Sequence, residues 1–211
     1  MADGFTIEID EDLARTIEQR AKEAGMSRED YVRFALVQQS FRYEDYTWTG
    51  DDPRTVRFAY GPQGKPRLVD ARGLTFNLTH SGGLALIAIA RGRRVGIDLE
   101  RIREIAESDQ IANSFFSRRE RDDIRDRETP ELRTRAFLAC WTRKEAYIKA
   151  RGAGLSFPLH ALEVPANAGE PSVLLEHDPD VRWSLLDLFV DTNHIAALAA
   201  EGGDCRVSWY V

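Results

Sequence analysis

The order of apolar and polar residues predicts short strands that alternate with helices along this chain. Strands are recognised by strict alternation, because successive strand side chains point to opposite faces. Helices are recognised by capping residues and by a period of about 3.6 residues. Strands are expected at residues 5–9, 55–60, 74–79, 84–90, 95–100, 183–190 and 195–200, and helices at residues 11–24 and 28–39.

A longer helix is expected from Pro130 to about Arg151. Thr129 can cap its first turn, proline is favoured at the first helical position, and Glu131 suits the positive end of the helix dipole. Gly152 is the expected stop signal, and Gly154 reinforces it.

Two stretches between these elements divide the chain. Residues 40–53 are aromatic and polar without a clear period and end in Gly-Asp-Asp-Pro, which indicates a connector. We therefore expect an N-terminal helical segment at residues 1–50 and a main domain at 54–211. Residues 101–128 carry dense charges of both signs, which predicts a solvated helical region.

The composition narrows the class of protein. The net charge of −6 argues against nonspecific nucleic-acid binding, which needs a basic surface. No basic segment followed by an apolar run opens the chain, and its longest apolar run, residues 84–90, is too short to span a membrane. Cys140 and Cys205 form no paired spacing, so we expect a cytoplasmic protein with reduced thiols and no zinc site.

Two motifs carry most of the chemistry. In the strand at 95–100, Asp98 and Glu100 share one face, whereas Val95, Ile97 and Leu99 share the other. In the long helix, Trp141, Glu145 and Lys149 are spaced by four residues and lie on one stripe. Three carboxylates and a lysine suit a hard divalent cation and a phosphate.

Each motif also has a purely structural interpretation. The two acids of the strand could form an ordinary exposed face. Glu145 and Lys149 could be an ion pair on a solvated helix, and Trp141 could belong to the core.

Four motifs occur in a characteristic order: Gly64-Lys65-Pro66, then Phe76-Asn77-Leu78-Thr79-His80-Ser81, then Gly96-Ile97-Asp98-Leu99-Glu100, then Trp141-x-x-Lys144-Glu145-Ala146-x-x-Lys149. In this order the chain resembles the 4′-phosphopantetheinyl transferases of the surfactin-synthetase-activating type over residues 54–200. Gly152-x-Gly154-Leu155 extends the resemblance.

The resemblance implies a fold and a reaction. The fold would be α/β (α+β), with two related subdomains at about residues 54–95 and 96–211. Each would hold a small, mainly antiparallel sheet and a long helix. The reaction would be the magnesium-dependent transfer of 4′-phosphopantetheine from coenzyme A to a serine of an apo acyl or peptidyl carrier protein, releasing adenosine 3′,5′-bisphosphate.

The resemblance also implies roles for individual residues. Magnesium would be bound by Asp98, Glu100 and Glu145, and the catalytic residues would be Glu145, as general base, and Lys149. The coenzyme A contacts would come from Lys65, Pro66, Thr79, His80, Lys144 and Lys149. For His80 a structural turn is the alternative.

The N-terminal segment suggests a second function class. Residues 5–39 faintly resemble a ribbon-helix-helix module, which reads DNA through its strand. Thr6 and Glu8 occupy that strand face here, and an acid against phosphate is unfavourable, so nucleic-acid binding is not expected. We expect residues 1–50 to form an altered first subdomain or an accessory dimerising element. The alternative function is that of a DNA-binding or protein-interaction protein with an inactive transferase domain.

Overall fold

The computed structural model describes residues 22, 57–69, 73–154, 157–166, 173–178, 181–203 and 205–208. Apart from residue 22, the segment at 1–50 lies outside the described residues, so the strand and helices expected there, and the ribbon-helix-helix resemblance, stay predictions.

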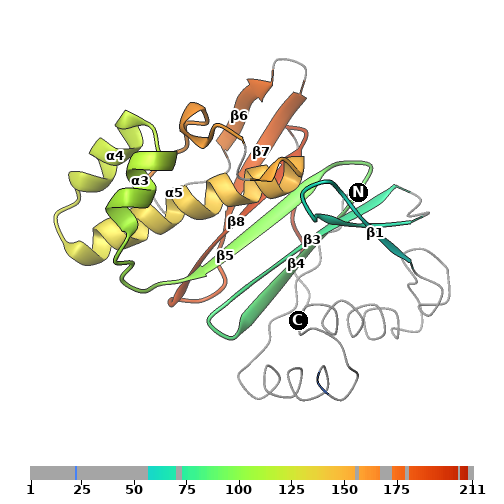
Figure 1. The fold of residues 1–211 in the computed structure, drawn as a ribbon, viewed down its shortest axis with the longest axis horizontal. Helices are drawn as coiled ribbons and strands as arrows, with labels where there is room; N and C mark the ends of the chain where they lie inside the picture. The colour runs from blue at the N-terminus through green and yellow to red at the C-terminus, as the bar shows by residue number, and fades with distance from the viewer. Residues whose placement is uncertain are drawn as a thin grey trace.

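The strands form three small antiparallel sheets in the described part of the chain (Figure 1). Two are hairpins, and the third contains four strands in the order β5-β8-β7-β6. The hairpin strands are β1 (Phe58–Tyr60) with β2 (Pro66–Leu68) and β3 (Leu74–Ser81) with β4 (Leu84–Arg91). The larger sheet contains β5 (Val95–Arg101), β6 (Val173–Asp178), β7 (Val181–Leu188) and β8 (His194–Glu201).

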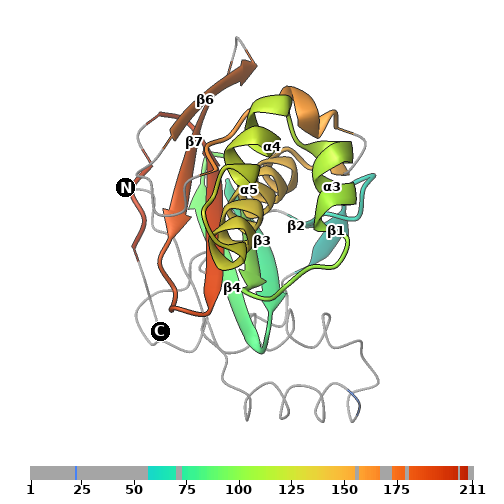
Figure 2. The same ribbon diagram turned by 90° about the vertical axis from the view of Figure 1, so that its left-hand side faces the viewer.

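The helices cover one face of the larger sheet. They are α3 (Ser108–Phe115), α4 (Arg118–Arg125), α5 (Pro130–Arg151) and the short 3₁₀ helix η3 (Leu159–Ala161). Figure 2 shows α5 against the sheet, with α3 and α4 beside it. The mixed α+β class expected from the sequence is confirmed by this arrangement.

The larger sheet is buried on both faces around β5 and β8. Ile195, Ala197 and Ala199 of β8 join the core under α5. Val95, Ile97 and Leu99 of β5 join a second core on the opposite face, with the apolar side chains of β4. The alternation predicted for the strand at 95–100 is therefore confirmed, although both of its faces are covered rather than one.

Helix α5 begins and ends where its capping residues predict. The Thr129 hydroxyl accepts a hydrogen bond from the Leu132 N–H, and Pro130 opens the first turn. At the other end Gly152 adopts φ 68°, a left-handed conformation that suits glycine. The helix places Glu145 and Lys149 in its C-terminal half, over β5.

Gly96 sets how closely α5 approaches β5. A Cβ at this position would overlap the backbone of Ala146 and Ala150 in α5.

We expect Gly96→Ala to lower the free energy of unfolding by about 3 kcal/mol, because overpacking against atoms that cannot rotate away forces the helix to shift. Thermal unfolding checks this, with Gly61→Ala as the control, since a Cβ there meets its nearest atom at an ordinary 3.6 Å. Equal melting temperatures for the two variants would contradict it.

Several predicted boundaries differ from the structure. A strand that was not expected, β2, begins at Pro66. Within the described residues β1 begins at Phe58, and residues 55 and 56 of the expected strand lie outside them. β3 continues through His80 to Ser81, because both residues still pair with β4. The charged region at 101–128 contains two separate helices, and one of its acids, Glu120, is buried.

The two predicted subdomains are only partly visible. The described residues of the first, 54–95, contain strands but no long helix, so its expected helix stays a prediction. None of the helices in the described residues has the length and apolar content needed to cross a membrane.

Candidate functional site

The centre of the candidate site is the Asp98 carboxylate. Asp98 lies on the face of β5 that is turned toward α5, and its side chain is only 6% exposed. The Lys149 ammonium of α5 donates to its Oδ1 at 2.5 Å. Thus the strand motif and the helix motif, far apart in the sequence, meet here.

The surroundings of Asp98 compensate its negative charge only in part. Its pKa is raised to about 7, mainly by burial and also by the charges of Glu145 and Glu100, although Lys149 opposes the increase. Its second oxygen, Oδ2, is buried and has no hydrogen-bond partner. An unpartnered, buried carboxylate oxygen beside two other acids is the environment that a cation would stabilise.

Glu145 lies in the same electrostatic environment. Its pKa is raised above the ordinary value, first by burial and also by Glu100, while Lys149 lowers it. The interpretation of Glu145 and Lys149 as a solvated surface pair therefore does not fit this structure, because Lys149 makes its ion pair with Asp98.

The three acids fit magnesium by their chemistry rather than by a preformed cage. Mg²⁺ prefers oxygen ligands, usually one or two carboxylates with water and substrate phosphate. However, no group of three or more His, Cys, Asp or Glu side chains among the described residues is arranged to enclose a metal. The Lys149 ammonium occupies Asp98 Oδ1 and leaves Oδ2 as the oxygen without a partner.

Thr79 lies beside Asp98 but is not available in the way the resemblance implies. Its hydroxyl lies 3.3 Å from Asp98 Oδ1 and accepts a hydrogen bond from the Leu99 N–H at 3.2 Å. With a relative exposure of 6%, it is buried among protein groups rather than open to a diphosphate. His80, the next residue, is exposed, and strand alternation places it on the opposite face of β3.

Lys65 is held by backbone carbonyls. Its ammonium donates to the carbonyl oxygens of Val95, Lys149 and Ala150 at 2.9, 2.5 and 3.1 Å. Burial, followed by the nearby Arg94 charge, lowers the pKa of Lys65 to about 8. The lysine side chain thus fastens the loop at 61–66 to the end of α5, next to Lys149, and Pro66 begins β2.

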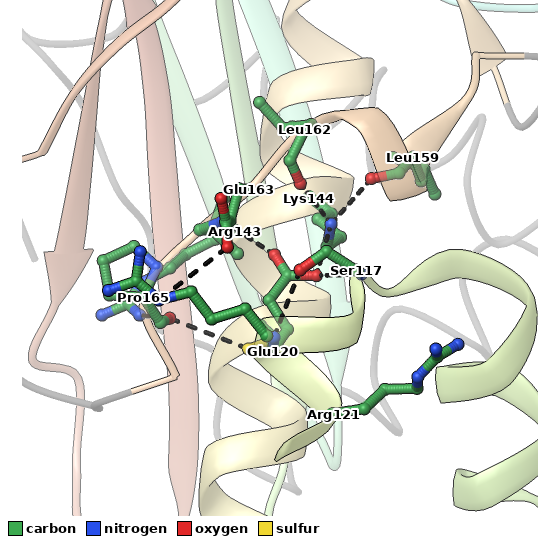
Figure 3. A network of polar contacts seen from close by, with 12 residues as sticks. Ser117, Glu120, Arg121, Arg143, Lys144, Leu159, Leu162, Glu163 and Pro165 are labelled. Atoms are coloured by element: carbon green, nitrogen blue, oxygen red, sulfur yellow. Dashed lines mark hydrogen bonds and ion pairs between the residues drawn. The ribbon is translucent and has the colours of Figure 1, made fainter. Parts of the chain in front are cut away.

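Lys144 does not join the Asp98 group, because its ammonium is bound within the protein on another side of α5. Its side chain has no exposed surface and forms an ion pair with Glu120 at 2.9 Å. Its ammonium also donates to the carbonyls of Leu159, at 2.7 Å, and Leu162 (Figure 3). The physical reason is the position of Lys144, about 100° around the helix from Glu145, which directs it toward α4 instead of β5.

Glu120 is a buried acid that the sequence analysis missed. Its carboxylate accepts hydrogen bonds from the N–H groups of Val164 and Ser117, each at 2.7 Å. Ser117 and Glu120 also form a capping box at the start of α4, and the Ser-x-x-Glu spacing is a signal that could have been read. The partner, Lys144, could not be found from local spacing.

Arg143 was also missed, and it extends this network along α5. Its guanidinium binds both carboxylate oxygens of Asp187, at 2.8 and 2.5 Å, and donates to the Pro165 carbonyl. Trp141, on the stripe with Glu145, is partly buried against the α5 core and meets Phe115 edge-on at 5.9 Å. Its core interpretation is therefore supported.

A pocket of about 610 Å³ opens in the described region, away from these acids. It lies between α3, α4 and the first turns of α5. Its lining mixes apolar and polar side chains with charges of both signs, which come from Glu104, Asp109, Arg121, Arg125 and Arg133. It contains none of the predicted site residues.

Comparison with known proteins identifies the family. The protein-family model described as 4′-phosphopantetheinyl transferase superfamily matches residues 94–199, which include β5, α5 and most of β8. The chain is 39% identical to the 4′-phosphopantetheinyl transferase HetI of Nostoc sp. strain PCC 7120 over 158 residues, 74% of this chain and 65% of the relative. It is 35% identical to the 4′-phosphopantetheinyl transferase Sfp of Bacillus subtilis over 131 residues, 61% of this chain and 57% of the relative.

A shorter match connects the chain to enterobacterial relatives. It is 40% identical to the 4′-phosphopantetheinyl transferase AcpT of Escherichia coli K12 over 93 residues, 44% of this chain and 47% of the relative. In each of these comparisons the match spans less than two thirds of the relative's length. The region matched by the family model nevertheless contains both acidic motifs, at residues 96–100 and 141–149. The chain therefore belongs to the 4′-phosphopantetheinyl transferase superfamily.

Proposed function

We propose that the protein transfers 4′-phosphopantetheine from coenzyme A to a serine of an apo acyl or peptidyl carrier protein. The serine oxygen forms a bond to the phosphorus next to the pantetheine, the phosphoanhydride bond breaks, and adenosine 3′,5′-bisphosphate leaves. The observation that carries the proposal is the meeting of Asp98, Glu145 and Lys149 between β5 and α5, in a chain that belongs to this superfamily.

Each residue has a role that its surroundings support. Asp98, Glu100 and Glu145 would hold Mg²⁺, which when bound neutralises charge on the diphosphate. Glu145 would take the proton of the attacking serine, directly or through water, and burial raises its pKa toward the range of an effective base. Lys149 would hold a phosphate oxygen once substrate competes with Asp98 for its ammonium.

The proposed coenzyme A contacts differ from those expected from the sequence at three residues: Lys65, Thr79 and Lys144. His80 is exposed near the end of β3, on the face opposite Thr79, and it is kept as a proposed diphosphate contact because its imidazole is open to a ligand. The loop at 61–66 would line the adenine pocket through its backbone and Pro66, because the Lys65 ammonium is bound to carbonyl oxygens. Thr79 and Lys144 are both bound within the protein and are removed from the ligand contacts.

The test is incubation of the protein with coenzyme A, magnesium and several apo carriers, read by intact mass. At least one carrier from fatty-acid, polyketide or peptide synthesis is expected to gain one phosphopantetheine, and chelation of magnesium should stop the gain. Carrier with its serine replaced by alanine is the control. If folded protein modifies none of these carriers, the proposed function is wrong, and the inactive-domain alternative gains support.

A further inference from the structure

β3 carries three polar side chains that contact β5 and that the proposed transfer does not use as ligand contacts: Asn77, Thr79 and Ser81, here called the polar stripe. They alternate with Leu78 and His80, so they share one face of the strand. Asn77 and Thr79 are each 6% exposed. Polar groups buried this deeply are expected to have partners, and these partners lie on β5.

The side chains of the polar stripe bind the backbone of β5, in the place where a neighbouring strand would offer backbone carbonyls. One edge of β5 pairs with β8 through its backbone. On the other edge, the N–H groups of Ile97, Leu99 and Arg101 donate to Asn77 Oδ1, Thr79 Oγ1 and Ser81 Oγ at 2.7, 3.2 and 3.0 Å. Each donor lies 20 residues after its acceptor, so β3 and β5 run in the same direction and in constant register.

The hydroxyls of the stripe make a second set of contacts, with the acids of β5. The Thr79 hydroxyl lies 3.3 Å from Asp98 Oδ1, and the Ser81 hydroxyl lies 3.2 Å from Glu100 Oε2. A hydroxyl has one proton to donate and lone pairs to accept with. Because the backbone N–H uses a lone pair, the proton of each hydroxyl is directed to the carboxylate of the residue just before that N–H.

We propose that the polar stripe positions the metal-binding carboxylates: Thr79 orients Asp98, and Ser81 orients Glu100. Asn77 only helps to join β3 to β5, since no described contact connects its side chain to an acid. The identity of the cation rests on the proposed function. Thr79 and Ser81 are accordingly positioning residues, not substrate contacts.

The experiment compares three threonine substitutions. Thr79→Val keeps the shape but removes the hydroxyl, Thr79→Ser keeps the hydroxyl, and Thr75→Val is the matched control. Thr75 lies on the same face of β3, but its hydroxyl donates to the Arg93 carbonyl at 2.5 Å and reaches no acid of β5 in the described contacts. Ser81→Ala, at the more exposed end of the stripe, is a fourth variant in case Thr79→Val does not fold.

Two readouts are measured without coenzyme A: Mg²⁺ affinity by calorimetry, and exchange of the Leu99 amide by NMR. Thr79→Val should weaken Mg²⁺ binding by about 10–100-fold, as the loss of a group that orients a ligand typically does, and should speed Leu99 exchange. Thr79→Ser keeps the hydroxyl, so its Mg²⁺ affinity and its Leu99 exchange rate should stay near the parent values. Ser81→Ala should weaken Mg²⁺ binding in the same direction, whereas Thr75→Val should leave the affinity unchanged.

The outcomes separate the two proposals. If the parent binds Mg²⁺ and modifies a carrier, but Thr79→Val and Ser81→Ala bind Mg²⁺ as the parent does, positioning is wrong and the proposed function stands. If Thr75→Val loses as much Mg²⁺ affinity as Thr79→Val, the positioning role of Thr79 is also wrong, because the loss would then come from a general loosening of the β3–β4 hairpin. If the folded parent neither binds Mg²⁺ nor modifies a carrier, the proposed function fails and the positioning role fails with it.

Discussion

Glu145→Gln is expected to slow phosphopantetheine transfer by at least about 10²–10⁴-fold, the range typical for loss of a general base, while the protein remains folded. The amide removes both a negative ligand and a base. It should be tolerated by the fold, because burial makes the negative charge of Glu145 costly, as its raised pKa indicates, and the amide carries no charge. Turnover, Mg²⁺ affinity without coenzyme A and thermal unfolding are measured together.

Lys149→Ala separates the roles of the two residues on this stripe of α5. Turnover should fall, because a charge that meets the developing phosphate charge is lost. Mg²⁺ binding without coenzyme A should not weaken, because the removed ammonium occupies an oxygen of Asp98. Glu131→Gln, in the exposed first turn of the same helix, is the control and should turn over like the parent. If all three variants turn over like the parent, the site assignment on α5 is wrong.

Local signals predicted the elements that hold the site. Alternation located β5, and Thr129, Pro130 and Gly152 bounded α5, because capping depends only on neighbouring residues. β2 was missed because it is only three residues long and begins at a proline that also ends a turn-rich loop. Strand signals are weak over so short a segment.

Partners distant in the sequence could not be predicted in the same way. Periodicity places Glu145 and Lys149 on one stripe, and an isolated helix would pair them. In the fold, β5 brings Asp98 next to Lys149, and the lysine forms its ion pair with Asp98. Likewise, the family resemblance places Thr79 and Lys144 among the ligand contacts, whereas in the fold both side chains are buried and bound to partners within the protein.

Glu120→Gln is expected to lower the free energy of unfolding by about 3–5 kcal/mol, because it leaves the Lys144 ammonium buried without a counter-charge. For a chain of this size the loss corresponds to a decrease of roughly 6–20 °C in melting temperature. The exposed neighbour Glu163 is the matched control. Its contact with Arg119 is 3.9 Å long between largely exposed side chains, so Glu163→Gln should cost less than about 1 kcal/mol.

A double substitution distinguishes a structural Lys144 from one that binds phosphate. Replacing both Glu120 and Lys144 by methionine removes the two buried charges together. It should therefore recover part of the stability lost in Glu120→Gln, since apolar replacements of buried ion pairs are often neutral or stabilising. The recovery is partial because the N–H groups of Val164 and Ser117 lose their acceptor. Transfer by the double variant should persist, because Lys144 is directed toward α4 and η3 instead of Asp98. If Lys144→Met instead abolishes transfer with an unchanged melting temperature, the lysine serves the substrate and the structural role assigned to it is wrong.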